Sequence, residues 1–306
     1  MRHLLPLLAA LCLAALPPTA RAADAAPAYA LPDTAVHLLH AARLNRDYEL
    51  YVSLPKSYAS AAGRSYPVVF VTDAPYAFPV TRAIAARVGG HGPALPEFIL
   101  VGLGYGKGDT PEFSRRRDYT PSANRGAELV SDMPGRAPAF GEAAGYRRFL
   151  ADEVFPFIAS HYRADMTRKV FAGHSYGGLL GADMLTSEPG LFQAYVLGSP
   201  SLWFDHRWLM NREKAWALGS STPGPRADVY LGAGEYEARA PKGARDKSRY
   251  ASEGDMVADV RAFAAALNAH QRDGLRLRTD VITGEDHLTV APILITRGLV
   301  WALGPR

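Results

Sequence analysis

The 306-residue chain has a single cysteine, Cys12, close to its N-terminus. One cysteine cannot form an internal disulfide, and loss of the N-terminal segment would leave no thiol for a cysteine nucleophile or a thiolate metal site. The sequence also lacks H-E-x-x-H and comparable ligand clusters, so we expect no metal and no other cofactor. Stability must then come from a hydrophobic core, for which 48% hydrophobic residues suffice.

The chain also has only a small excess of positive over negative residues. The formal net charge is +4, and it falls by two if a segment containing Arg2 and Arg21 is removed. The one dense basic stretch is Arg115-Arg116-Arg117. So small an excess, without an RNA-binding signature, is not typical of a nucleic-acid partner. We therefore expect a small-molecule substrate.

No apolar run near the N-terminus is long enough to span a bilayer as a stable helix. Residues 1–22 follow the order of a secretory signal: Arg2 and His3, a short apolar run, two prolines, and a small-residue cleavage site at Ala20-Arg21-Ala22. A lipoprotein signal at Cys12 is the weaker alternative because the large Leu11 precedes it. The sequence predicts a cleaved signal peptide, a secreted and periplasmic protein without a stable membrane anchor, and one catalytic domain over residues 23–306.

Strand-like and helix-like segments alternate through that domain. Apolar runs of strand length end in small or acidic residues: YPVVFVTDA, FILVGLGYG, KVFAGHS, AYVLGSP, ADVYLGAGE and LRTDVITGEDH. Helical periodicity appears in residues 143–162, 177–185, 254–271 and 289–303. This alternation predicts an α/β fold with a mostly parallel central sheet and helices on both faces. Residues 35–55 alternate as a preceding antiparallel strand pair, and the stretches 105–138 and 203–225 are expected to be irregular.

The stretch FAGHSYGGL places Ser175 in a G-x-S-x-G pattern between a strand ending and a helix start. Such a turn forces the serine into a strained conformation that exposes its hydroxyl above the sheet. Gly173 and Gly177 are expected because a Cβ at either position would meet the neighbouring strand or helix. We therefore predict that Ser175 is a nucleophile, the alternative being an idle serine in a glycine-rich turn.

A serine hydroxyl needs a neighbouring base, and His287 follows the last predicted strand, in TGEDHLTV. An acid is expected after ADVYLGAG, where Glu235 comes first and Glu237 two residues later. A serine–histidine dyad stays open, as does the alternative that both glutamates only solvate the loop. Oxyanion donors are expected from the main-chain N–H groups of Tyr176, after the nucleophile, and Ala74, after an early strand.

Taken together, these stretches resemble the siderophore-esterase branch of the Putative esterase family within the α/β hydrolases. The similarity runs from about Asp47 to the C-terminus, through VGLGYG, RRRDYTP, GHSYGG, SPSLWF and GEDHLTVAP. It implies an α/β-hydrolase fold and ester hydrolysis through an acyl-enzyme, with Ser175 and His287 as the catalytic pair. The chain differs where the family often has Asp-Gly, here Asp73-Ala74, and where a small residue is common, here Leu288.

The resemblance also implies a siderophore trilactone as substrate, with the ferric catecholate as one candidate form. An arginine among Arg115, Arg116 and Arg117 would hold anionic catecholates, and Trp203 would stack on their rings. A solvated loop is the alternative for the arginines. Two other functions stay open: an acyltransferase, in which an alcohol replaces water, and a non-catalytic binding protein on the same fold.

Overall fold

The computed structural model describes residues 29–89, 94–124, 130–217, 227–244, 246–252, 254–270 and 274–304. The chain divides into two units, residues 1–32 and 33–306. The predicted signal peptide over residues 1–22, with Cys12, lies outside the described residues. Within the described residues, no helix combines the length and the apolar character needed to cross a membrane.

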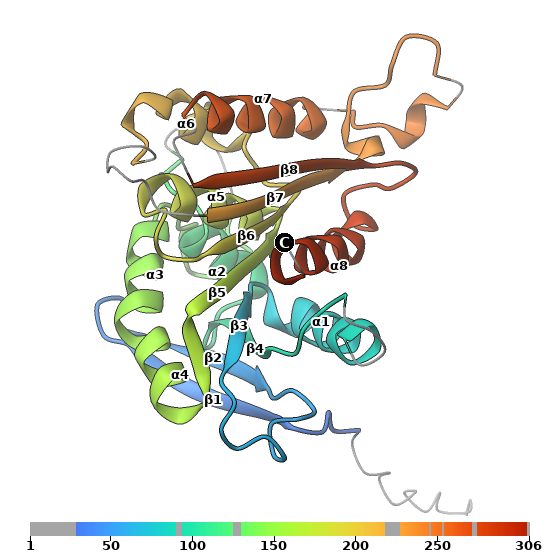
Figure 1. The fold of residues 1–306 in the computed structure, drawn as a ribbon. Helices are drawn as coiled ribbons and strands as arrows, with labels where there is room; N and C mark the ends of the chain where they lie inside the picture. The colour runs from blue at the N-terminus through green and yellow to red at the C-terminus, as the bar shows by residue number, and fades with distance from the viewer. Residues whose placement is uncertain are drawn as a thin grey trace, which may run out of the picture. The chain divides into compact units, whose positions relative to one another are not determined.

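The second unit is built on one eight-stranded sheet in the order β1-β2-β4-β3-β5-β6-β7-β8 (Figure 1). β1 pairs with β2, and β2 with β4, in antiparallel fashion, and every later pairing is parallel. The strands are β1 (Thr34–Ala41), β2 (Arg46–Ser53), β3 (Tyr66–Val71), β4 (Ile99–Gly106), β5 (Ala164–His174), β6 (Ala194–Gly198), β7 (Ala227–Gly234) and β8 (Leu275–Ile282). The predicted α/β class, with its antiparallel N-terminal pair, is confirmed.

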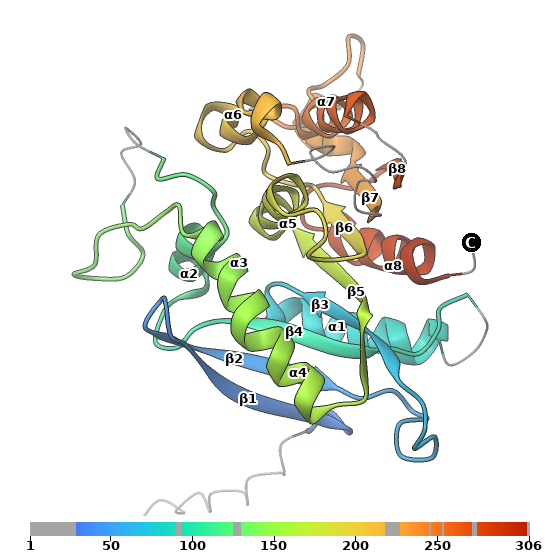
Figure 2. The same ribbon diagram turned by 60° about the vertical axis from the view of Figure 1, so that its left-hand side comes forward.

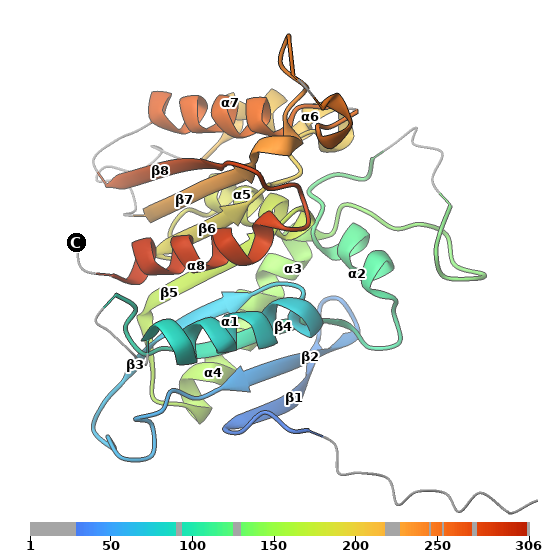
Figure 3. The same ribbon diagram turned by 90° about the vertical axis from the view of Figure 1, so that its right-hand side faces the viewer.

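Helices cover both faces of the sheet. α1 and α8 lie together on one face, and α3, α4 and α5 lie on the other (Figures 2 and 3). α7 packs on β7 and β8. The helices are α1 (Ala74–Val88), α2 (Pro111–Asp118), α3 (Ala143–Phe149), α4 (Phe155–His161), α5 (Tyr176–Ser187), α6 (Phe204–Asn211), α7 (Met256–Ala269) and α8 (Val290–Leu303).

The burial of the central strands explains why they read as unbroken apolar runs. Every residue of β3, β6 and β7 is buried, as expected for parallel strands with helices on both faces. An aromatic cluster fills the core on the α4 side, where Phe192 contacts the rings of Phe70, Phe155, Phe171 and Tyr195. The core fixes the strands whose carboxyl ends carry the candidate site.

The expectation of irregular structure was wrong in two places. The first stretch contains α2, which begins at Pro111 after Thr110, whose side chain accepts a hydrogen bond from the Phe113 N–H. The second contains α6, which is interrupted by positive φ values at Asp205, His206 and Arg207. Both helices have only eight residues, so periodicity did not reveal them, although the Thr-Pro pair before α2 is a helix-start signal.

Candidate active site

Ser175 occupies a strained turn between β5 and α5. Its backbone has φ 59° and ψ −120°, a region that residues with a side chain rarely adopt. Three hydrogen bonds hold it there: its N–H donates to the Gly198 carbonyl, and its carbonyl accepts from the N–H groups of Leu179 and Ser201. The turn therefore has the geometry predicted for a nucleophile-bearing serine.

Glycine is required around Ser175 because the backbone segments are nearly in contact. A Cβ on Gly173 would collide with the Gly177 carbonyl, and one on Gly177 would collide with the Thr72 hydroxyl. The same added atom on Gly177 would lie 3.4 Å from the Asp73 carboxylate. The absence of side chains thus brings the starts of α5 and α1 together beside Ser175.

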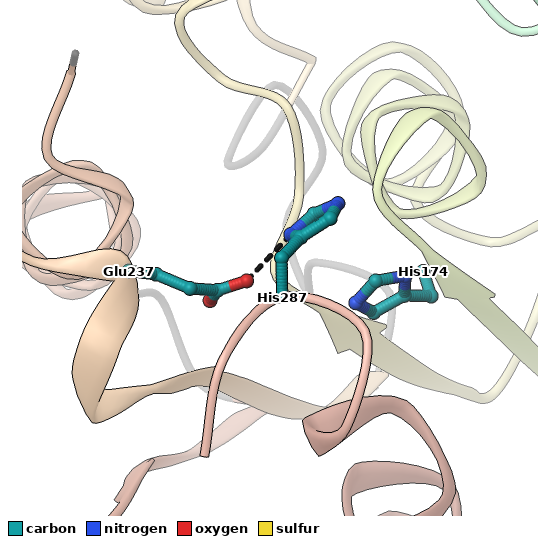
Figure 4. A group of neighbouring side chains, drawn as sticks. All are labelled: His174, Glu237 and His287. Atoms are coloured by element: carbon teal, nitrogen blue, oxygen red, sulfur yellow. Dashed lines mark hydrogen bonds and ion pairs between the residues drawn. The ribbon is translucent and has the colours of Figure 1, made fainter. Parts of the chain in front are cut away.

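His287 lies on the loop between β8 and α8 and is oriented by Glu237. The distance between His287 Nδ1 and Glu237 Oε1 is 2.5 Å (Figure 4). The other oxygen of Glu237 accepts hydrogen bonds from the Ser199 hydroxyl at 2.7 Å and the Gly234 N–H at 3.0 Å. A buried carboxylate with its acceptors satisfied is a fixed partner for the imidazole, and the second ring nitrogen of His287 points away from it.

Glu235 does not occupy the position we expected for it. Its carboxylate accepts from the Gly284 N–H at 2.9 Å, and so it braces the loop that carries His287 without contacting the ring. The physical reason is the 3₁₀ turn over Glu235–Glu237, which directs the two glutamate side chains differently at the end of β7. The acid beside the histidine is Glu237, the second candidate in the sequence.

Glu285 and Asp286, the two acidic residues just before His287, form hydrogen bonds that hold the loop. The Glu285 carbonyl accepts from the Tyr236 N–H, and the Asp286 carboxylate accepts from the N–H groups of Leu288 and Thr289. These bonds lower the pKa of Asp286 and fix the backbone on either side of His287.

His174, at the end of β5, packs against His287. Their ring centroids are 4.6 Å apart, and Figure 4 shows the His174 ring directed toward His287. Burial, together with the nearby His287 and Arg115, lowers the pKa of His174 to about 3. His174 is therefore a neutral neighbour of the candidate base at physiological pH.

The two expected oxyanion donors begin helices. Ala74 is the first residue of α1, directly after Asp73 in a left-handed conformation (φ 57°), and Tyr176 is the first residue of α5. The first N–H groups of a helix have no intrahelical acceptor and lie at the positive end of its dipole. Since Gly177 approaches Thr72 and Asp73, these two helix starts face the same region.

A cavity of about 580 Å³ opens beside this region. Its apolar wall includes Tyr76, Leu288, Ala291 and Ile295, and its polar wall includes Asp73, Tyr105, Glu112, Arg115 and Asp132. Gly173 and His174 line the part of the cavity that lies next to the Ser175 turn. Of the two sequence differences noted above, Leu288 lines this cavity, and Ala74 directly follows the lining residue Asp73.

Arg115 is the member of the arginine triplet that lines the cavity. Its Nε lies 2.8 Å from Asp73 Oδ1, and its guanidinium lies over the Tyr176 ring at 5.6 Å. Burial raises the pKa of Asp73, while Arg115 and the hydrogen bond from the Tyr105 hydroxyl oppose that shift. Asp73 and Tyr105 were not singled out in the sequence, although Asp73 ends a predicted strand on the site edge.

The other two arginines face elsewhere, because successive residues of α2 point about 100° apart around the helix. Arg116 pairs with Glu112 at 2.8 Å and donates to the Val130 carbonyl. Arg117 is buried between Asp109, at 2.7 Å, and Asp118, at 2.8 Å. The expectation that either binds substrate from a loop does not fit this geometry.

Trp203 lies at the start of α6, outside the residues that line the cavity. Its side chain is half exposed, and its ring centroid is 6.1 Å from that of Tyr176. The Tyr176 ring therefore contacts both Trp203 and the Arg115 guanidinium. The three side chains form an aromatic and cationic surface beside the Ser175 turn.

The fold and this arrangement of residues define the class of the protein: an α/β-hydrolase fold with a strained serine turn after β5 and an acid–histidine pair after its last two strands. The chain belongs to the Putative esterase family, whose model matches residues 41–273.

Relatives with named activities cover most of the chain. It is 30% identical over 284 residues to the ferri-bacillibactin esterase BesA of Bacillus subtilis, covering 91% of this chain and 92% of the relative. It is 28% identical to the siderophore enterobactin esterase of Emericella nidulans over 57% of this chain and 60% of that protein. The fold matches the crystal structure of the BES protein from Bacillus cereus with a TM-score of 0.74 and 22% identity, covering 92% and 99% of the two chains.

The roles of the two glutamates give a first prediction. Glu237→Gln replaces the acceptor of the His287 N–H with a neutral amide, so kcat for ester hydrolysis should fall by about 10²- to 10⁴-fold. Glu235→Gln should lower it by less than about 10-fold, because Glu235 contacts only the loop. Steady-state kinetics on a p-nitrophenyl ester would measure both, and a larger loss in Glu235→Gln would contradict the assignment.

The arginine triplet gives a second prediction. Arg117→Ala removes the cation that the buried Asp109 and Asp118 share and leaves each with a single, more exposed arginine, Arg136 and Arg46 respectively, so it should lower the free energy of unfolding by about 3 kcal/mol. Arg116→Ala removes a more exposed pair and should cost less than about 1 kcal/mol. Urea denaturation compares the two variants, and equal losses would show that Arg117 is no more structural than Arg116.

Proposed function

We propose that this protein is a serine esterase that hydrolyses the ester bonds of a siderophore through an acyl-enzyme on Ser175. The observation that carries the proposal is the buried Glu237 carboxylate on Nδ1 of His287, next to a strained serine turn. Membership of the Putative esterase family and the names of the relatives support the bond type and the substrate class.

The chemistry begins with proton transfer. With Nδ1–H donated to Glu237, the lone pair of His287 is on Nε2, where it can take the proton from the Ser175 hydroxyl as the oxygen attacks the ester carbonyl. The main-chain N–H groups of Ala74 and Tyr176 would stabilise the negative charge that develops on the carbonyl oxygen. His287 then returns the proton to the departing alkoxide, which leaves as an alcohol.

Water completes the reaction by the same steps. His287 removes a proton from water as it attacks the acyl-enzyme, and then protonates Ser175 as the free acid departs. Each cycle consumes one water and releases one alcohol and one carboxylic acid. An acyltransferase would differ only in using an alcohol in place of this water.

The cavity supports an aromatic, hydroxyl-bearing substrate. Its apolar wall suits a flat ring, while the carboxylates of Asp73, Glu112 and Asp132 accept hydrogen bonds from hydroxyl groups. Arg115 is the cation nearest to such a ring, but Asp73 already balances its charge. The catechol groups of an iron-free siderophore, which are donors when protonated, fit this lining better than fully ionised catecholates.

The proposed location is the periplasm, reached through cleavage of residues 1–22. The n-region, apolar run and cleavage site described above support it. N-terminal sequencing of the protein recovered from a periplasmic extract would test this, with an N-terminus near Ala23 expected.

A third prediction tests the nucleophile. Ser175→Ala should reduce hydrolysis of a tris-catecholate trilactone, followed by chromatography of the released acids, by about 10⁴-fold or more. Circular dichroism would establish that the variant is folded. A folded wild-type protein that hydrolyses neither the trilactone nor short p-nitrophenyl esters would refute the esterase.

A fourth prediction concerns substrate binding. Arg115→Gln should raise KM for the catecholate trilactone by about 10-fold, the loss of a charge-assisted hydrogen bond, and leave kcat/KM for p-nitrophenyl acetate nearly unchanged. Arg116→Gln is the matched control, since Arg116 lies on the same helix and is not among the residues that line the cavity, although its partner Glu112 is. Equal KM values in the two variants would remove Arg115 from the substrate site.

A further inference from the structure

The cluster formed by His174, Glu237 and His287 contains two imidazoles and a carboxylate (Figure 4). One potential ligand atom from each residue lies within 4.8 Å of the others. Three atoms this close lie no more than about 2.8 Å from a common centre, and metal–ligand distances for Zn²⁺ are about 2.1 Å. Side-chain movements of less than about 1 Å would therefore close the three ligands around an ion.

The unused hydrogen-bonding capacity of His174 points to a ligand. Its Nε2 atom is buried and makes no hydrogen bond of standard geometry with the residues that the structure describes, although the His287 main chain lies near enough to raise the pKa of His174 slightly. Buried polar atoms in folded proteins nearly always have a partner, so an orphaned imidazole nitrogen is unusual. The proposed ester chemistry makes no use of this nitrogen.

We infer that a divalent transition-metal ion of the Zn²⁺ type binds between His174, Glu237 and His287 and inhibits the enzyme. Two histidines and one carboxylate, with a fourth position open to water, are a common ligand set for zinc. The side chain of His287 is 35% exposed, so an ion can reach the cluster from solvent. The positive charge of Arg115, which acts on His174, is offset by its ion pair with Asp73.

Metal binding would disable His287 without changing the protonation of the cluster as a whole. If the ion takes Nδ1, the ring proton moves to Nε2, which then has no lone pair for the serine proton. If the ion takes Nε2, that lone pair is occupied directly. In both cases His287 remains a neutral imidazole. In the first case the Glu237 carboxylate loses the hydrogen bond from Nδ1–H and binds the ion instead, and in the second case it retains that hydrogen bond.

The inhibition rests on the proposed esterase activity, whereas metal binding does not, and the experiment measures the two separately. Calorimetric titration of ZnCl₂ into tag-free protein gives the dissociation constant, and visible absorption of added Co²⁺ reports tetrahedral coordination. In parallel, the Zn²⁺ concentration that halves p-nitrophenyl ester hydrolysis is measured, and a chelator should restore the rate.

His174→Asn should weaken Zn²⁺ binding and raise the half-inhibitory concentration, each by at least about 10-fold. His270→Asn is the matched control, because His270 forms another histidine–glutamate pair, with Glu213 at 3.0 Å, and its removal should change neither value. Should His174→Asn fail to fold, His174→Gln serves in its place. Glu237→Gln should also lose affinity.

The outcomes separate the two proposals. Zn²⁺ affinity that is the same in wild type and His174→Asn overturns the metal site, whatever the activity. His174-dependent binding in a protein without esterase activity supports the metal site and refutes the proposed function. Binding that depends on His174 but leaves hydrolysis unaffected overturns the inhibitory role.

Discussion

The close approach of β5, α5 and the β3–α1 turn is the constraint on which the site depends. Ser175 is held in a left-handed backbone by a hydrogen bond that its N–H donates to Gly198 and by two that its carbonyl accepts from Leu179 and Ser201. Those segments can meet because glycines stand where side chains would collide. The strain of one residue is thus balanced by the packing of three elements, at a point where α5 begins close to the start of α1.

The carboxylates of Glu237 and Asp73 have different surroundings and different roles. Glu237 is buried with its oxygens satisfied by Ser199, Gly234 and His287, which makes it a stationary acceptor. Asp73 is held by Arg115 and Tyr105 at the cavity wall, where burial raises its pKa. Glu237 thus belongs to the apparatus that orients the base, while Asp73 shapes the surface that a substrate would meet. Between these groups, His174 contributes a neutral ring with an unused nitrogen.

The helix α2 decides how the arginine triplet is divided. Arg115 is turned to the cavity, Arg116 to Glu112, and Arg117 into a buried cluster of ion pairs. A loop would have left all three free to reach an anionic ligand. The helix leaves a single arginine at the cavity, already paired with Asp73, and this is why the cavity suits a hydroxyl-bearing aromatic group better than a highly charged one.

The sequence by itself determined the strands, the helices other than α1, α2 and α6, the antiparallel start of the sheet, and the glycine-rich turn at Ser175, because periodicity and backbone sterics are local properties. The choice of Glu237 over Glu235, the contact between His174 and His287, and the separate directions of the three arginines came only from the tertiary structure. Each of these depends on which way a side chain leaves a turn or a short helix, and on partners far away in the chain. Residues 237 and 287 are 50 positions apart, and only the parallel pairing of β7 with β8 brings their loops together.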